Sequence, residues 1–182
     1  SSLTEKQLVQ LSEVKQSLMR MTHLNKSLLM LTRIENQQYK QAEYISFQTL
    51  TTDIIEDLSD LIAFKSLEVN IEEISDFQVE MNPDLARVLV SNLLRNAIKY
   101  TEKGGNIQIL IEENRFQVKN TAKDIMHLDP SKIFQRFHKG EQDATSTGLG
   151  LAIVKSIAER YHLKVYYTFE EGKHCFQVTG VR

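Results

Sequence analysis

The stretch NLLRNAIKYT, residues 92–101, sets two asparagines, Asn92 and Asn96, four positions apart in a segment whose other face is apolar. Upstream, Asn82 is a candidate N-cap and Pro83 suits a first helical turn, so we predict one continuous helix through this stretch. Residues four apart share a helix face, and a buried asparagine is costly unless its amide is hydrogen-bonded. The pair therefore indicates either a polar ligand on this face or an exposed, solvated stripe, and the stretch alone favours neither.

The composition bounds the class of protein. With 182 residues, 41% of them hydrophobic, the chain can form one ordinary domain with a real core. A net charge of -2 argues against a general attraction to nucleic acid or to an anionic membrane. The single cysteine, Cys175, cannot form an internal disulfide, which suits a reducing compartment. No apolar run approaches the roughly 20 residues that cross a bilayer, so we expect this region to be cytoplasmic.

The first part of the chain has the pattern of a long amphipathic helix. Apolar residues recur at three- and four-residue steps from Leu3 to about Ile34, and the polar ENQQYKQ, residues 35–41, predicts a hinge after it. The apolar stripe is too narrow to fold alone. We therefore expect the helix to pair with other helices, in its own chain or in a second subunit, or else to lie on its own domain.

Beyond the hinge, helical and extended patterns alternate. Strands are predicted over 43–48, 67–73, 76–81, 106–112, 115–120, 163–169 and 174–180, and helices over 49–65, 82–101 and 147–161. The helix over 49–65 is expected to bury Ile54, Ile55, Leu58, Leu61 and Ile62. The segment 121–146 is polar and mostly irregular. This order predicts an α+β fold, a two-layer sandwich with helices on one face of a mostly antiparallel sheet, preceded by the long helix.

A second motif, TSTGLGLAIV at residues 145–154, places two glycines where a helix begins. Gly148 and Gly150 lack a Cβ, so a ligand can approach the backbone and the unpaired N–H groups of the helix, an arrangement that suits a phosphate. By itself the pattern is more often a simple turn. The intervening SKIFQRFHKGEQDATS, residues 131–146, predicts a lid that is anchored by apolar residues and faces a polyanion with cations. The anchors would be Ile133, Phe134 and Phe137, and the cationic side would hold Arg136, His138 and Lys139.

These motifs together resemble the catalytic ATP-binding domain of sensor histidine kinases, in the superfamily that also holds gyrase, the large heat-shock chaperones and the mismatch-repair ATPases. NLLRNAIKYT resembles the N box of that family, IFQRFHKG (133–140) its F box and TGLGLAIVK (147–155) its G2 box, in the family's order. The resemblance implies a Bergerat-type sandwich over residues 40–182.

The start of the chain carries a further part of the resemblance. LNKSLLMLTRIENQQY, residues 24–39, is similar to the end of the second helix of the dimerisation and histidine-phosphotransfer hairpin. The resemblance therefore implies two domains, an incomplete hairpin over 1–39 and the catalytic domain over 40–182.

The resemblance also implies the ligands, ATP and Mg²⁺, and the residues that bind them. Asn96 would hold the Mg²⁺ with Asn92 beside it, because an amide oxygen is a hard, neutral ligand for this ion. Lys99 would face phosphate and Tyr100 would pack near the adenine or ribose. Lys139 would point at the γ-phosphate as the catalytic cation. The phosphates would be lined by the glycine-rich turn and its backbone N–H groups, at Thr147, Gly148, Leu149 and Gly150.

One motif departs from the family. Where the family's G1 box reads Asp-x-Gly-x-Gly, this chain has VKNTAKDI, residues 118–125. Asn120 replaces the aspartate, and Ala122 and Asp124 replace the glycines. Asn120 can still accept a hydrogen bond from the adenine amine but without charge assistance, which we expect to weaken binding by about 1 kcal/mol. We predict modest ATP affinity, in the upper micromolar range or weaker.

The family's phosphoacceptor histidine is directly followed by an acidic residue, and none of the five histidines here qualifies. Four are followed by non-acidic residues, and the fifth lies in the lid region: His23, His138, His162, His174 and His127. Each is interpreted as structural or surface. We expect the phosphoacceptor helix to lie upstream in a longer, membrane-anchored parent. The expected partners are that hairpin, a response regulator receiver domain and a second copy of the parent, with no nucleic acid and no membrane contact by this region.

Three alternatives stay open. A self-contained ATPase of the gyrase or chaperone type needs a general base to activate water, and that branch has glutamate at the position of Asn92, whose amide cannot accept a proton. A pseudokinase is favoured by the altered G1 box and disfavoured by the intact N and G2 boxes. A serine/threonine kinase of the anti-sigma type is disfavoured by the hairpin-like helix over residues 3–37.

Overall fold

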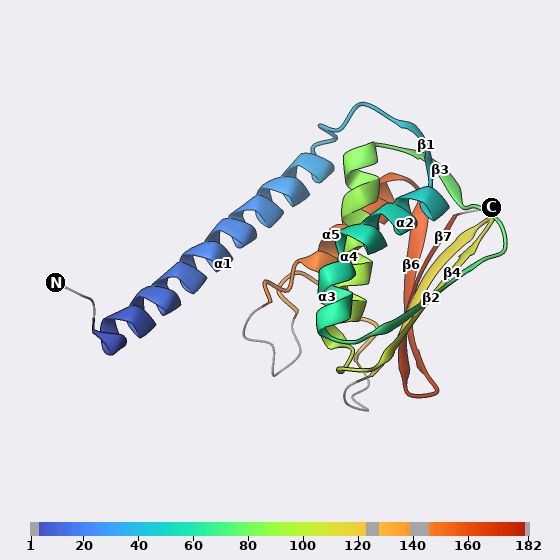
Figure 1. Ribbon diagram of the computed structural model, residues 1–182. Coiled ribbons are helices and arrows are strands. Elements are labelled where there is room, and N and C mark those ends of the chain that lie inside the picture. Colours follow the sequence, from blue (N-terminus) through green and yellow to red (C-terminus); the bar gives the residue numbers. More distant parts are fainter. Residues whose placement is uncertain (1–3, 123–127, 139–145, 181–182) are drawn as a thin grey trace.

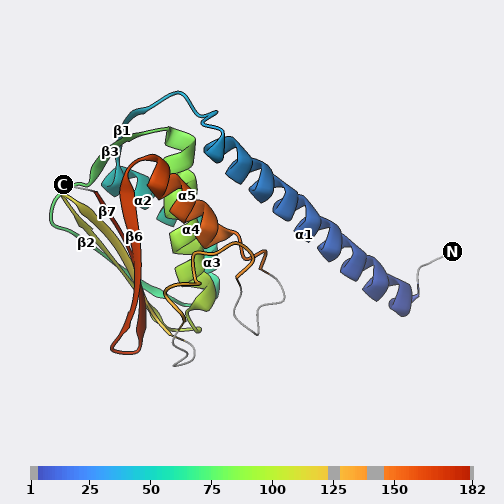
Figure 2. The same ribbon diagram turned by 180° about the vertical axis from the view of Figure 1, so that it is seen from behind.

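The computed structural model describes residues 4–122, 128–138 and 146–180. Helices form one layer and a five-stranded sheet the other, and the first helix projects from this sandwich as a separate rod (Figures 1 and 2). The helices are α1 (Glu5–Glu35), α2 (Phe47–Asp57), α3 (Ser59–Phe64), α4 (Pro83–Tyr100) and α5 (Gly150–Arg160). The strands are β1 (Glu43–Ser46), β2 (Glu68–Glu73), β3 (Gln78–Met81), β4 (Asn106–Glu112), β5 (Arg115–Thr121), β6 (Leu163–Glu170) and β7 (Lys173–Gly180).

The main sheet has the strand order β2-β4-β5-β7-β6, and β1 pairs with β3 in a separate small sheet. The β2–β4 pair is parallel, and the other neighbouring pairs are antiparallel. Alternate residues of β4 and β5, such as Ile107, Ile109 and Val118, are buried toward the helices. The predicted α+β sandwich with a mostly antiparallel sheet is confirmed.

Helix α4 is the central helix, and both of its ends are held by specific hydrogen bonds. The Asn82 side chain accepts from the Leu85 backbone N–H at 3.1 Å, which confirms the predicted N-cap. At the other end, the Lys65 ammonium donates to the carbonyl oxygens of Ile98 (2.7 Å) and Thr101 (2.6 Å). These bonds satisfy carbonyl groups that a helix C-terminus leaves without intrahelical partners. Helix α4 is therefore fixed in length and position.

The prediction for residues 43–65 was partly wrong. The strand ends at Ser46, whose hydroxyl accepts from the Thr49 backbone N–H at 3.1 Å, so a helix starts already at Phe47. The predicted single helix is also divided at Leu58 into α2 and α3. Leu61 was expected to be buried but is 40% exposed because it lies on α3, which buries none of its residues.

Helix α1 contacts the domain only through its C-terminal turns, where Ser27, Leu31 and Ile34 are buried and the helix packs against α5. Towards its start, Leu8, Leu11, Val14, Leu18 and Met21 are 53–66% exposed. The C-terminal end of the helix thus lies on its own domain, and the rest of the helix projects away from it (Figure 1). The projecting part presents an uncovered apolar stripe.

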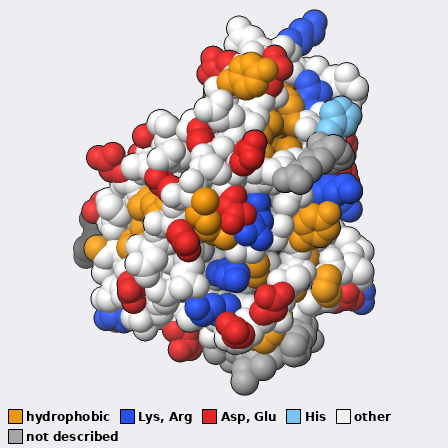
Figure 3. Space-filling model, turned by 90° about the vertical axis from the view of Figure 1, so that its right-hand side faces the viewer, with side chains coloured by type: hydrophobic (Ala, Val, Ile, Leu, Met, Phe, Trp, Pro, Cys, Tyr) orange, Lys and Arg blue, Asp and Glu red, His pale blue; other side chains and the backbone are white. Residues whose placement is uncertain are grey.

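The surface agrees with the near-neutral composition. On the face shown in Figure 3, acidic and basic side chains are interspersed, without a broad patch of one sign. No helix in the described ranges combines the length and apolar character that a bilayer crossing requires.

Candidate functional site

The asparagine motif of α4 and the glycine motif at the start of α5 lie next to each other. The half-buried Asn92 donates from Nδ2 to the Val88 carbonyl at 2.9 Å, which fixes its amide. Its Oδ1 then faces Gly150 so closely that a Cβ built on Gly150 would lie 3.0 Å from it. A glycine at this position therefore lets the N-terminus of α5 approach the polar face of α4.

One turn further along α4, Asn96 is also half-buried. Its side chain makes no hydrogen bond with another residue of the described ranges. An accessible amide oxygen fits the predicted Mg²⁺ ligand. The same ranges hold no cluster of three or more His, Cys, Asp or Glu that would suit a metal held by the protein alone. Lys99, which is exposed, lies 5.3 Å from the ring centroid of Tyr100.

The start of α5 is held against the segment 128–138. Gly148 has φ +68°, and a Cβ built there would lie 2.8 Å from the Phe137 carbonyl carbon and 2.9 Å from the His138 carbonyl oxygen. The Phe137 N–H donates to the Gly148 carbonyl at 2.9 Å. Leu149 is buried and leads into α5, whose first turn has no side-chain cap. The backbone N–H groups there suit an anion, and half-buried Thr147 precedes them.

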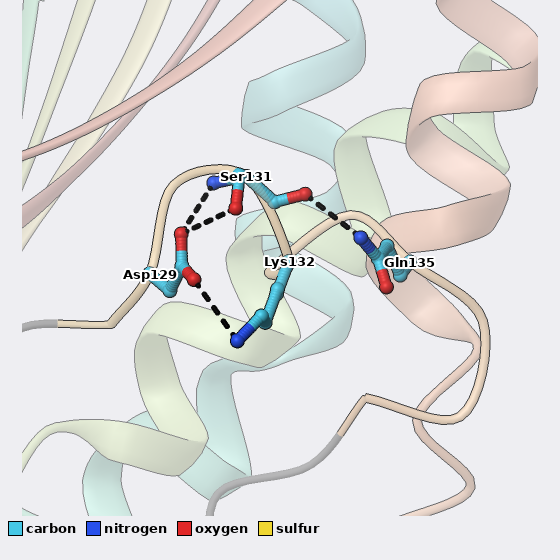
Figure 4. A network of polar contacts seen from close by, with 4 residues as sticks. All are labelled: Asp129, Ser131, Lys132 and Gln135. Carbon is cyan, nitrogen blue, oxygen red and sulfur yellow. Dashed lines mark hydrogen bonds and ion pairs between the residues drawn. The ribbon is translucent and has the colours of Figure 1, made fainter.

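The segment 128–138 has its own polar network (Figure 4). Asp129 accepts from the Ser131 backbone N–H at 2.9 Å and its hydroxyl at 2.6 Å, and it pairs with Lys132 at 3.4 Å. These hydrogen bonds from Ser131 are the main cause that lowers the pKa of Asp129. Gln135 donates to the Ser131 carbonyl at 3.1 Å. The segment is thus locally ordered by its own side chains.

Two expectations for this segment were wrong. Ile133 and Phe134 pack into the core as predicted. Phe137 was also expected to be an anchor, but it is 56% exposed because its backbone is hydrogen-bonded to Gly148. Arg136 forms an ion pair with Glu35 of α1 and so faces the hinge instead of a polyanion. Lys139, predicted to be the catalytic cation, lies outside the described residues.

Asn120 lies on β5, directly opposite Ile107 of β4 and His174 of β7. It is buried, and its Nδ2 donates to the Thr121 carbonyl at 3.2 Å. Helix α4 packs over this strand, and the buried Asn120 lies on the face of the sheet that the helices cover. Asp124, the other notable change in the G1 region, lies outside the described residues.

No sequence motif predicted the partners of Asn120 on the sheet. His174 is buried and its Nδ1 lies 2.8 Å from the Tyr167 hydroxyl. Burial lowers the pKa of His174 and raises that of Tyr167. The alternation of the final hairpin places both on the inner face, but the register that sets His174 beside Asn120 is not visible in either strand alone.

The geometry is that of a nucleotide-binding α+β sandwich, and comparison with known proteins gives the family. A family model described as histidine kinase-, DNA gyrase B-, and HSP90-like ATPase matches residues 81–179, more than half of the chain. The chain therefore belongs to this family, and the sequence-based resemblance is confirmed.

Curated relatives include the heme sensor protein HssS of Staphylococcus aureus, strains JH9 and Newman, each 33% identical over 150 residues. The match covers 80% of this chain and 33% of HssS, so the chain spans about a third of the length of these relatives.

Solved structures of histidine kinases share the fold. The catalytic domain of ThkA matches with a TM-score of 0.67 at 24% identity, covering 76% of this chain and 94% of that one. The cytoplasmic segment of QseC matches with a TM-score of 0.65 at 21% identity, covering 90% and 93%. ThkA in complex with the response regulator protein TrrA matches with a TM-score of 0.72 at 20% identity, covering 100% of this chain and 53% of that one. The chain thus shares the fold of these histidine kinase structures.

Proposed function

We propose that this chain is the catalytic part of a sensor histidine kinase, which binds ATP with Mg²⁺ and transfers the γ-phosphoryl group to a histidine outside the given sequence. The observation that carries the proposal is the close approach of Gly150 to Asn92. A Cβ built on Gly150 would lie 3.0 Å from Oδ1 of Asn92. This approach brings the asparagine amides of α4 close to the free backbone N–H groups at the start of α5. A polyphosphate with a bound metal ion needs both, an oxygen ligand for the metal and N–H donors for the phosphate oxygens.

Each site residue has a physical role in this proposal. Asn96 would hold the Mg²⁺, which neutralises phosphate charge when it is bound. The backbone N–H groups around Gly148, Leu149 and Gly150, after Thr147, would hold the phosphate oxygens. Lys99 and Lys139 would add positive charge, Tyr100 would pack on the nucleoside, and Asn120 would accept from the adenine amine. The protein thereby contributes mainly positioning and electrostatic stabilisation.

The transfer step moves one phosphoryl group. A nitrogen of the accepting imidazole would form the new N–P bond while the bond from the γ-phosphorus to its bridging oxygen breaks and ADP leaves. The imidazole proton would pass to the acidic residue that follows the accepting histidine. None of the histidines in this chain has such a neighbour, so the acceptor would lie on the first helix of the hairpin.

The division into an incomplete hairpin, residues 1–39, and a catalytic domain, residues 40–182, belongs to the same proposal. The exposed apolar stripe on the first half of α1 supports packing within a helical bundle of a homodimeric, membrane-anchored parent. The ThkA–TrrA complex supports a response regulator as the final acceptor, on an aspartate.

The decisive experiment mixes this chain with a separately prepared hairpin that contains the acceptor histidine, in γ-labelled ATP and Mg²⁺. Label on that histidine is expected, and it should be lost in Asn96→Ala but kept in Asn70→Ala, an exposed asparagine of β2 that serves as the matched control. Nucleotide binding without label would identify a pseudokinase. Rapid phosphate release without the hairpin would identify a self-contained ATPase.

A further inference from the structure

Three buried polar side chains converge on the inner face of the sheet, at the β5–β7–β6 junction. Asn120, Tyr167 and His174 are 1%, 6% and 9% exposed. Asn120 and His174 are direct cross-strand partners, so their side chains point to the same face. Buried polar groups are costly unless they are hydrogen-bonded. Neither Asn120 Oδ1 nor His174 Nε2 bonds another described residue, so both atoms are suited to a ligand.

The hydrogen-bonding character of His174 depends on its contact with the Tyr167 hydroxyl. The Tyr167 hydroxyl lies 2.8 Å from Nδ1 of His174, and we assign the hydroxyl as the donor to this nitrogen. A neutral imidazole that accepts at Nδ1 carries its hydrogen on Nε2. Burial lowers the pKa of His174, which favours this neutral form. With Nδ1 as the acceptor, His174 Nε2 is a donor.

The amide of Asn120 is fixed in the same way. Its Nδ2 donates to the Thr121 carbonyl at 3.2 Å, so its Oδ1 is the acceptor left for a ligand. The sheet thus presents one acceptor and one donor on neighbouring strands. The edge of a 6-aminopurine has the complementary pattern, with the 6-amino group as donor and ring N1 as acceptor.

We propose, on the basis of the ATP-binding function above, that His174 is a specificity residue for the base: its Nε2–H donates to N1 of adenine while Asn120 Oδ1 accepts from the 6-amino group. Tyr167 is a positioning residue that acts through His174. A guanine would present an acceptor at position 6 and a donor at N1, so both contacts would be mismatched. The pair thereby provides base selection in a site whose asparagine lacks the charge of an aspartate.

Atom-replacement nucleotides test the assignment in the full chain with Mg²⁺. By calorimetry, 1-deaza-ATP, in which a C–H replaces N1, is expected to bind the unmodified chain about 3- to 10-fold more weakly than ATP, the effect of one lost hydrogen bond. His174→Phe keeps an aromatic ring and is expected to bind the two nucleotides equally. Tyr167→Phe, which leaves the imidazole tautomer unfixed, is expected to give an intermediate ratio.

A nucleotide lacking the other group is the internal control. Purine riboside triphosphate, without the 6-amino group, should bind more weakly than ATP to the unmodified chain and to His174→Phe alike, since it reports on Asn120. Equal binding of ATP and 1-deaza-ATP by the unmodified chain would overturn the role of His174 and leave the proposed function standing. Absence of any ATP binding would overturn both. If His174→Phe does not fold, the unmodified chain and Tyr167→Phe decide the question with the same nucleotides.

Discussion

Replacing Gly148 with alanine would place a methyl group where the structure has no room for it. The added Cβ would lie 2.8 to 2.9 Å from backbone atoms of Phe137 and His138, which cannot move aside by rotating a side chain. The residue also has φ +68°, where an L-residue costs about 1–2 kcal/mol. Separation of the two segments would relieve the clash but break the Phe137 to Gly148 hydrogen bond, worth about 1 kcal/mol.

The strain and the lost hydrogen bond affect the free energy of unfolding and the free energy of ATP binding differently. Because the clash is relieved by local separation, the free energy of unfolding should fall by about 2–3 kcal/mol, from the backbone strain together with the broken hydrogen bond. The start of α5 would lose its support from segment 128–138, and we expect ATP to bind at least about tenfold more weakly, equivalent to about 1.4 kcal/mol. Urea unfolding and calorimetry measure the two quantities separately.

Gly104→Ala is the matched control. Gly104 has φ +77° but no atom within 4 Å of a built Cβ, so alanine there introduces the backbone strain without the clash. It should lose about 1–2 kcal/mol of stability, from the backbone strain alone, and bind ATP normally. If Gly148→Ala bound ATP as tightly as Gly104→Ala does, the contact between Gly148 and the Phe137 segment would have no part in forming the site.

Three further outcomes are expected. Thr51→Val should raise the free energy of unfolding by about 1 kcal/mol in urea titration, since Thr51 is fully buried and its hydroxyl has no hydrogen-bond partner in the described part of the chain. Asn96→Ala should abolish the Mg²⁺-dependent part of ATP binding, measured by calorimetry with and without the ion, while the unfolding curve stays unchanged. Because burial lowers the pKa of His174 below its ordinary 6.5, the unfolded chain takes up this proton at higher pH than the folded chain. Stability should therefore decline as the pH falls from about 6.5 through the folded pKa, and His174→Phe should flatten that slope in unfolding experiments across this pH range.

Local signals predicted the parts of the fold whose causes are local. Asn82 and Pro83 start α4 through capping and a preset backbone angle, and both act within one helical turn. Where a strand-like alternation and a helix N-cap occurred in the same stretch, the sequence did not show which of the two would prevail. The alternating EYISFQ favoured a strand through Gln48, but the Ser46 hydroxyl caps a helix that starts at Phe47, and burial of Phe47 in the core stabilises this helix.

The site was predictable only to the extent that its residues lie in contiguous motifs. Asn92 and Gly150 each belong to a recognisable stretch, although their mutual approach depends on how α4 and α5 pack. His174 and Tyr167 belong to no such stretch. Their position beside Asn120 follows from the register of β5, β7 and β6, which long-range pairing determines. Likewise, the pairing of Arg136 with Glu35 joins residues far apart in sequence.

The connection between α1 and the proposed nucleotide site depends on packing more than on charge. The Arg136–Glu35 pair is exposed, and such pairs contribute about 0–1 kcal/mol. By contrast, Leu31 and Ile34 are buried against the domain, and each side chain contributes about 1.5–3 kcal/mol. The C-terminal turns of α1 pack on α5 and therefore move with it. Since α5 begins at Gly150, beside Asn92, a rotation of α1 would be transmitted through packed side chains to the start of α5, where we propose that the phosphates bind.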